Sequence, residues 1–406
     1  MQTQPIDNKG MTKNTFLNRC IFIVSFFTFS GFYAILAITI SLLGSSATRL
    51  ITVPVRLLTT ILMVSVIFYS YKKGKQFSKK EKIIKMLFFL FWSLYIIKLL
   101  WHHSQGYHLR LNWIEYLFYA LNFCILPFFM YMSISFETYK KTILDALIFS
   151  GFLMGLTTLY LYKDIITSGI GRISLIIYQN PDMETLNPLM LSYASILGIM
   201  LCFYEILYNK SKTKWYTIYL WATIGLSVVM FLLGASRGSV LALFISILYL
   251  SYQADAKIKV RILGLILVLT PVLIWAVAAS GSAVFERTSN SFDSGQTGRE
   301  SLWMTAWNEF TNYPILGGRI EIGFYPHNIF IETLMATGIL GFLILITILL
   351  KSLNRAIVLP KIDSNFIWVA IILIQGVCQH SFTGALYSSI LVFFPMGLLY
   401  SKSKTD

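Results

Sequence analysis

The chain has 406 residues, of which 56% are hydrophobic and only 13% are charged, and its formal net charge is +15. A soluble domain carries about twice that fraction of charged residues. This composition excludes an ordinary soluble protein and predicts an all-α polytopic membrane protein that forms a single integral membrane domain over 1–406.

Apolar runs close to the roughly 20 residues that cross a bilayer recur along the whole chain. They predict about twelve transmembrane helices. The third, eighth, eleventh and twelfth runs are short enough to be tilted or partly re-entrant segments. The expected spans are 20–42, 51–70, 86–101, 112–133, 143–162, 188–207, 216–233, 239–253, 262–280, 329–350, 366–380 and 385–400.

Basic residues are divided unevenly between the loops that join these spans. With the N-terminus inside, 23 of the 33 basic residues fall in one set of loops and in the two tails, most densely in the basic loop 71–85. The positive-inside rule then places both termini in the cytoplasm. The net charge is therefore a topology signal, and no basic groove with stacking aromatics predicts nucleic acid as a partner.

The other ten basic residues fall on the expected outer side, and eight of them are arginines. The arginine side chain is a planar fork of donors that suits phosphate and stays charged when partly buried. An arginine-rich outer rim therefore indicates a bound phosphate. For Arg49, Arg56 and Arg110 we expect contact with lipid headgroups instead.

The sequence predicts neither a metal site nor a cofactor. The four cysteines lie in or at the start of apolar spans, with no CxxC spacing, so we expect no disulfide and no metal finger. No DxD-type carboxylate pair and no phosphate-cradling glycine loop is found, which argues against a nucleotide-sugar donor. The polar first 19 residues hold no small-residue cleavage site, and the first span should be a retained signal anchor.

The longest outer loop, 281–327, joins the ninth and tenth expected spans. Thr297 and Glu300 have the spacing of a capping box and predict the start of an amphipathic helix on the outer interface. Arg299 would then lie in the first turn, where free N–H groups favour an anion. Tryptophans on the apolar face would lie at headgroup depth. The expected apolar face consists of Leu302, Trp303, Ala306, Trp307 and Phe310.

Three glycines follow that helix. Gly317, Gly318 and Gly323 either make the loop a hinged lid or only form turns, and the sequence leaves both readings open. Nothing in the sequence fixes the position of Arg319, which is a secondary candidate for binding substrate.

Two further polar segments border the outer loop. Arg237 lies in a short connection of small residues, and a charge at membrane depth is kept mainly for function or pairing. We expect it to point into an outer cavity. His327 opens the tenth span, where the helix dipole favours a neutral ring and a nearby phosphate would favour the charged one. With Arg237 and Arg299 on the same rim, we expect His327 to be catalytic and Asn328 to contact substrate.

Three segments in this order resemble the O-antigen polymerase and ligase superfamily of bacterial envelope glycan assembly. They are SRGS at 236–239, TGRESLW at 297–303 and HNIFIETLMATGILGF at 327–342. An S-R-G turn, a G-R in the large periplasmic loop and an H-N before a G-x-x-G helix recur in that superfamily. The similarity covers about 170–345, and the first 165 residues resemble the superfamily only in hydropathy.

The resemblance implies a GT-C-like, metal-independent, inverting glycosyltransferase of the bacterial inner membrane, with its active site on the periplasmic face. Its partners would be membrane lipids, undecaprenyl-diphosphate-linked glycans as donor and acceptor, and a chain-length regulator. By this resemblance Arg237 and Arg299 bind the donor diphosphate, and His327 activates or orients the acceptor hydroxyl.

Within that superfamily the sequence favours an O-antigen polymerase of lipopolysaccharide biosynthesis. The segment ETLNPLMLSY at 184–193 resembles the L-N-P start of a span in polymerases, and Arg172 before it is a second candidate contact for sugar or phosphate. A ligase that transfers the glycan to lipid A-core stays open. So do a cell wall polymerase and a lipid-linked oligosaccharide flippase, although flippases and transporters usually carry charges near the bilayer midplane.

Overall fold

The structure is a computed structural model, and it describes residues 8–44, 48–72, 79–168, 188–209, 213–234, 236–280 and 299–401. These residues form helices joined by turns, with no strand among them, which confirms the all-α fold. In chain order the first helices are α1 (Asn8–Phe27), α2 (Ser30–Leu43), α3 (Thr48–Lys72), α4 (Lys79–Ser104), α5 (Trp113–Ala120), η2 (Leu121–Ile125), α6 (Leu126–Ser133), α7 (Phe136–Leu161) and α8 (Lys163–Ser168).

The second half of the chain continues the pattern. Its elements are α10 (Pro188–Tyr208), α11 (Lys214–Gly234), α12 (Arg237–Gln253), α13 (Ala256–Ser280), α15 (Glu300–Asn312), α16 (Ile329–Val358), η4 (Leu359–Lys361), α17 (Phe366–Phe382), η5 (Leu386–Ser388) and α18 (Ile390–Leu399).

Seven helices in the described ranges are long and apolar enough to cross a membrane, and the bent pair of α1 and α2 would make eight. Three shorter apolar helices lie at Gly238–Gln253, Phe366–Phe382 and Ile390–Leu399. The eighth, eleventh and twelfth expected spans are therefore short, whereas the third belongs to a full-length helix over Glu81–Ser104. A polytopic membrane protein is confirmed, and the count of twelve stays a prediction.

Two of the expected spans are broken. The first consists of α1 and α2, which meet at an angle of 66° beside Thr28. The fourth contains the π-helical turn η2, followed by Pro127 in the first turn of α6. Such breaks widen or redirect a helix and often occur at functional sites. Both of these breaks line the cavity described below.

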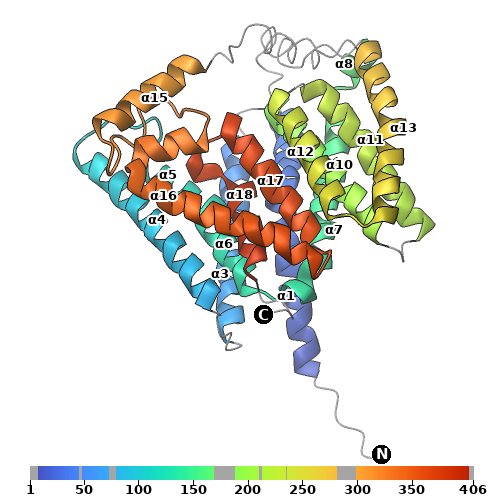
Figure 1. Cartoon of the computed structure of the whole chain (residues 1–406), viewed down its shortest axis with the longest axis horizontal. Coiled ribbons are helices and arrows are strands. Elements are labelled where there is room, and N and C mark those ends of the chain that lie inside the picture. The colour runs from blue at the N-terminus through green and yellow to red at the C-terminus, as the bar shows by residue number, and fades with distance from the viewer. Residues whose placement is uncertain are drawn as a thin grey trace, which may run out of the picture.

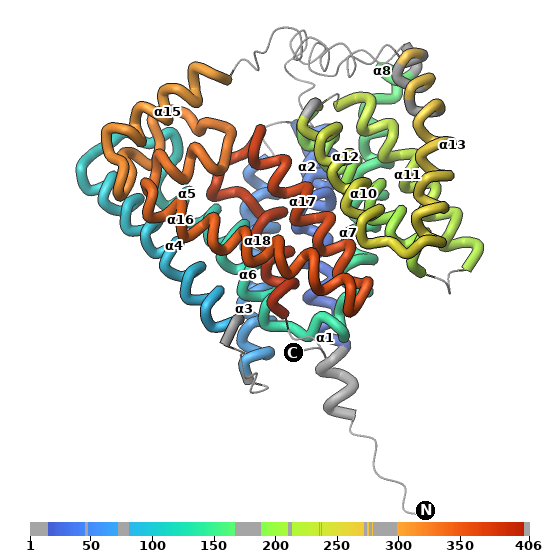
Figure 2. Tube along the Cα trace, viewed as in Figure 1, coloured from blue at the N-terminus to red at the C-terminus, as the bar shows by residue number. Residues whose placement is uncertain are grey.

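The helices α17 and α18 form the centre of the bundle (Figure 2). In α17, side chains from Phe366 to Leu373 are buried without interruption, so this helix is covered on all sides. It packs against α10, α12, α16 and α18, and α18 packs against α6. A helix that is apolar all round belongs in such a central position.

The described parts of the loops expected on the outer side lie at one end of the bundle. Figure 1 shows α8 and α15 at one end, and the end of α3 with the start of α4 at the other. The helix α15 lies across that end and packs against α16. The expected amphipathic helix is thus present, with one correction to its face: Glu309 is buried, whereas Trp307 is 46% exposed.

The loop after α15 fills a kink in α16. Gly338 has φ 64° and ψ −165° inside that helix, which frees backbone groups from the helical ladder. The loop satisfies them: Ile339 N donates to Pro314 O at 2.8 Å, and Gly318 N donates to Met335 O at 2.9 Å. Gly317, with φ 74°, faces the kink so closely that a Cβ there would meet backbone atoms at 2.6 Å. At Gly317 and Gly318 the loop packs against the kink of α16, and whether the loop also moves as a lid stays open.

Candidate active site at the outer end of the bundle

His327 lies directly before α16 in a strained backbone conformation. Its φ of 57° is the only positive value among the described residues other than glycine. Such a conformation costs about 1 to 3 kcal/mol and persists where the surrounding structure holds it. Asn328 helps to fix this backbone conformation, because its side chain caps α16 by accepting from Phe330 N at 2.9 Å and Ile331 N at 3.2 Å. The oxygen of Asn328, expected to contact substrate, is therefore occupied by the helix cap.

The His327 ring is half-buried and neutral at physiological pH. Burial, followed by the positive charges of Arg299 and Arg110, lowers its pKa to about 4. The ring lies 4.3 Å from the ring of Tyr325. Its Nδ1 is buried and meets no hydrogen-bond partner among the described residues. A neutral imidazole with an unpaired nitrogen can accept a proton from a ligand.

Arg299 is the N-cap residue of α15 and not part of its first turn. The helix begins at Glu300, and Arg299 makes no side-chain cap bond to it. The capping box expected from Thr297 is therefore wrong for this helix start, and Thr297 itself lies outside the described residues. The helix therefore begins two residues later than a cap at Thr297 would predict.

A tryptophan connects α15 to the catalytic candidate. Trp303 Nε1 donates to the carbonyl oxygen of Pro326, the residue before His327, at 2.8 Å. Trp303 is partly buried and hydrogen-bonded inside the protein, and its expected position at headgroup depth stays a prediction. This bond holds the start of α15 beside His327, which agrees with the electrostatic effect of Arg299 on the His327 ring.

The SRGS segment packs on the start of α10. The backbone of Arg237 begins α12, and the preceding Ser236 N donates to Ser192 Oγ at 3.2 Å. Gly238 touches the hydroxyl of Tyr193 so closely that a Cβ would not fit. The side chain of Arg237, expected to point into an outer cavity, lies outside the described part of the structure.

Arg319 is held firmly, contrary to the expectation that nothing fixes it. Its Nε and Nη2 donate to Glu309 Oε1 and Oε2 at 3.2 and 3.1 Å, and its backbone N donates to Oε1 at 2.9 Å. Burial would raise the pKa of Glu309, but the bonds and charge of Arg319 outweigh it and hold that pKa below its usual value. The guanidinium is thus committed to a carboxylate. Arg172, the remaining candidate, lies outside the described residues.

Arg110, which was assigned to lipid headgroups, instead contacts the protein around His327. Its Nη2 donates to Tyr387 Oη at 2.8 Å, and its Nε lies 3.3 Å from Glu321 Oε1. Its guanidinium also lies over the ring of Tyr325 at 5.0 Å. No motif marks Arg110. The signal in the sequence was an arginine on the expected outer side together with a carboxylate, Glu321, in the longest loop of that side.

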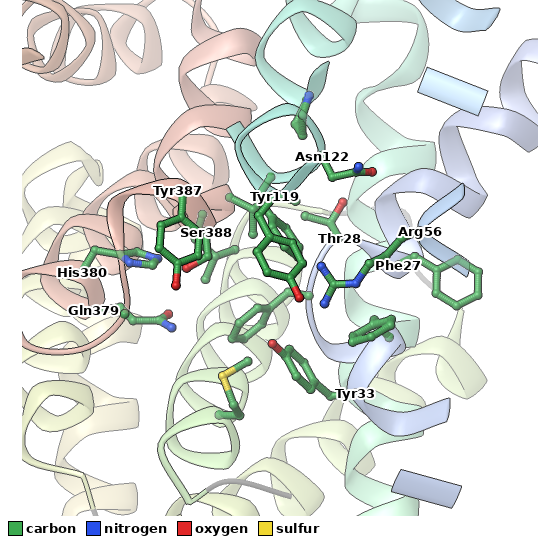
Figure 3. A pocket seen from close by; sticks show the side chains of 18 of the residues that line it. Phe27, Thr28, Tyr33, Arg56, Tyr119, Asn122, Gln379, His380, Tyr387 and Ser388 are labelled. Carbon is green, nitrogen blue, oxygen red and sulfur yellow. The ribbon is translucent and has the colours of Figure 1, made fainter. Parts of the chain in front are cut away.

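A cavity of about 350 Å³ lies beside His327 and reaches into the helix bundle. Aromatic and aliphatic side chains of α1–α3, α5–α6, α10 and α17–α18 form most of its wall. Figure 3 shows polar side chains converging on it from two sides. Of the polar residues in its wall, the sequence pointed only to His327 as a site residue. The others, which no motif marks, include Arg56, Asn122, Gln379, His380, Tyr387 and Ser388.

In the described ranges no three His, Cys, Asp or Glu side chains gather as a metal site requires. The prediction of metal-independent chemistry stays a prediction.

Comparison with known proteins gave one family match. Residues 222–346 match the model of the family described as O-antigen ligase. The match contains the SRGS segment, Arg299 and His327, and it ends inside α16. The comparison with curated proteins and the comparison with solved structures each gave no match.

Proposed function

We propose that this chain is a polymerase of the O-antigen polymerase and ligase superfamily, a glycosyltransferase that joins lipid-linked repeat units. The match of residues 222–346 to the family described as O-antigen ligase supports this proposal. The observation that carries the proposal is a neutral His327 that lines the cavity and is influenced by the charge of Arg299. In this proposal the outer end of the bundle faces the periplasm, and both termini lie in the cytoplasm.

The arginines stabilise the leaving group. The acceptor hydroxyl attacks the anomeric carbon of the growing chain, a new glycosidic bond forms, and the bond to the undecaprenyl diphosphate oxygen breaks. The diphosphate leaves with the bonding electrons, and the positive charges of Arg299 and Arg237 would stabilise the negative charge that develops on it. Electrostatic stabilisation of this kind is usually the largest contribution, and loss of one donor costs about 10² to 10³ in rate.

His327 takes the proton of the attacking hydroxyl. In the ligand-free protein, burial and two arginines keep the pKa of its ring low, so the ring is unprotonated and ready to accept. A diphosphate bound at Arg299 would offset one of those positive charges and raise the pKa of His327, which makes it a stronger base when the donor is present. General-base catalysis contributes about 10² to 10⁴ in rate.

A ligase is the second candidate, and the match to a family described as O-antigen ligase favours it. Both enzymes would use the same diphosphate leaving group and differ only in the acceptor. The polymerase is preferred because of the L-N-P segment at 186–188 in the sequence and the largely apolar cavity beside His327. A flippase is less well supported, since the family match and the outer rim of charge both accord with a transferase.

Deletion of the gene followed by a lipopolysaccharide gel tests the proposal. A polymerase mutant would leave lipid A-core with one repeat, whereas a ligase mutant would leave bare core and lipid-linked polymer. Repeats trapped in the cytoplasmic leaflet would indicate a flippase.

Complementation with variants then tests the site. Arg237→Ala, Arg299→Ala and His327→Ala should each fail to restore long chains. Arg49→Ala is the matched control, because Arg49 is an exposed arginine at the outer end of α3 and lies outside the cavity. Long chains in all three site variants would contradict the assignment.

A further inference from the structure

Arg56 is a charged residue inside a membrane-spanning helix. It lies eight residues after Thr48, the first residue of α3, and a helix rises about 1.5 Å per residue. Its Cα is therefore about 12 Å from the helix end. A charge at such depth is costly and usually marks a substrate pathway or a pair with an opposite charge.

Within the described part of the chain, no carboxylate pairs with Arg56. The described residues that line the cavity include no Asp or Glu. The Nε and Nη1 atoms of Arg56 are buried and meet no hydrogen-bond partner among the described residues. Three rings surround the guanidinium carbon, with centroids at 4.6 Å for Phe123, 5.0 Å for Tyr119 and 5.1 Å for Phe32. Cation–π contacts stabilise the charge in part, but they leave the Nε and Nη1 donors without an acceptor.

The cavity supplies the other features that an amphiphilic phosphate needs. Figure 3 shows Arg56 pointing toward Tyr33 and Tyr119, with Gln379 and Tyr387 on the facing side. These groups offer hydroxyl and amide contacts for a sugar. The volume of about 350 Å³ is within the usual range for ligand pockets, and the apolar remainder of the wall suits a lipid chain.

The same cavity reaches the catalytic candidate. His327 and Tyr325 line it, whereas Arg299 is not among its described lining residues. A headgroup held at Arg56 would therefore approach His327 from the side of the bundle, separately from an anion held at Arg299. Polymerisation requires such an arrangement, because both of its substrates are lipid phosphates.

We propose that this cavity is the acceptor subsite, where Arg56 binds the phosphate of a second, lipid-linked substrate and presents its sugar to His327. The identification of this ligand as the acceptor rests on the proposed function. The binding of a lipid-borne phosphate at Arg56 is independent of it. Two lipids carry that chemistry, an undecaprenyl diphosphate and an anionic phospholipid, and the test separates them.

Native mass spectrometry of the purified full-length protein measures this binding. The parent carries Arg237→Ala and Arg299→Ala, so that the donor site does not mask the second one. Undecaprenyl diphosphate and phosphatidylglycerol are titrated separately. Arg56→Ala should weaken binding of undecaprenyl diphosphate by about tenfold to a hundredfold, the loss expected for charge-assisted hydrogen bonds. Arg56→Lys should keep part of the affinity, and Arg49→Ala should change nothing.

The outcomes separate the alternatives. Unchanged binding in Arg56→Ala, or equal loss for both lipids, would overturn the acceptor subsite. If Arg56→Ala does not accumulate, Thr59→Leu replaces it, because Thr59 lines the cavity and a larger side chain there fills the site without removing the charge. Unaltered binding in Thr59→Leu would overturn the proposal equally.

This readout requires no catalysis. Binding lost in Arg56→Ala, together with long glycans in the gene deletion, would refute the proposed function and leave the lipid site standing. Unchanged binding in Arg56→Ala, together with loss of long glycans in the gene deletion, would refute the lipid site alone.

Discussion

Arg319 and Glu309 form a bidentate ion pair between α15 and the loop that follows it, with nitrogen-to-oxygen distances of 3.2 and 3.1 Å. Glu309 also accepts from the backbone N of Arg319 at 2.9 Å. The pair lies next to Gly318, where a Cβ would meet Glu309 Oε1. Glu309 thus fixes the loop that leads to His327, and we expect Arg319 to affect the site by holding this loop in place.

Glu309→Gln and Arg319→Lys should have matching effects. Each removes the two-pronged charged contact, so we expect a loss of about 1 to 2 kcal/mol in stability and shorter glycan chains. Thermal unfolding of the purified variants and the lipopolysaccharide gel measure the two effects. If Arg319 bound substrate directly, Arg319→Lys alone would shorten the chains and Glu309→Gln would leave them long.

Gly338→Ala should disrupt the join between the loop and α16. The φ of 64° at this position strains any L side chain, and a Cβ would overlap the backbone of Ile315 and Gly317. We expect a loss of more than about 1 kcal/mol in stability, read as a lower melting temperature. The control is Gly264→Ala, at a helical glycine where an added methyl group would have no atom within 4 Å, and this change should be neutral or slightly stabilising. Equal effects of the two changes would contradict the role given to the kink.

The stability of the protein should depend on pH through His327. Its pKa is about 4 in the folded protein, below the value of about 6.5 for an unfolded histidine. The unfolded chain therefore binds the proton more tightly, and stability falls as the pH drops from about 6.5 toward about 4. The melting temperature of His327→Gln should fall less between about pH 7 and about pH 5 than that of the parent. An equal fall in both would show that the ring is not held neutral by its surroundings.

Arg110 and Glu321 should be coupled in a double-mutant cycle. Burial raises the pKa of Glu321, and Arg110 counteracts that shift by favouring the charged carboxylate. Arg110→Ala leaves this buried carboxyl without its partner, so we expect a loss of about 1 to 3 kcal/mol. Adding Glu321→Gln should recover part of it, as measured by thermal unfolding. Losses that simply add would contradict the pairing.

Much of the fold could be predicted because hydropathy is a local property of the chain. Each of the twelve expected spans contains at least one helix of the structure. The breaks were missed, since the 66° bend at Thr28 and the π-helical turn η2 depend on packing with other helices. The kink at Gly338 was missed for a similar reason, because its backbone groups bond to a loop whose path the local pattern does not fix.

The candidate site could be predicted only where short motifs carry it. His327 and Arg299 lie in such motifs, and the structure brings them together. Arg56 and Arg110 lie in the first third of the chain, outside the segments that resemble the superfamily, and contact with lipid headgroups was the natural expectation for them. Their neighbours Phe123 and Tyr387 belong to other helices, so only the tertiary structure reveals their surroundings.

Polymerisation by the purified full-length protein in lipid nanodiscs tests the central claim most directly. The substrate is a single repeat unit on undecaprenyl diphosphate, and both the chain length and the free undecaprenyl diphosphate are measured. The account predicts longer lipid-linked chains and one free undecaprenyl diphosphate for each new linkage, with both reduced at least about a hundredfold in His327→Gln and unchanged in Arg49→Ala. Extension that persists in His327→Gln, or transfer that occurs only when lipid A-core is added, would contradict it.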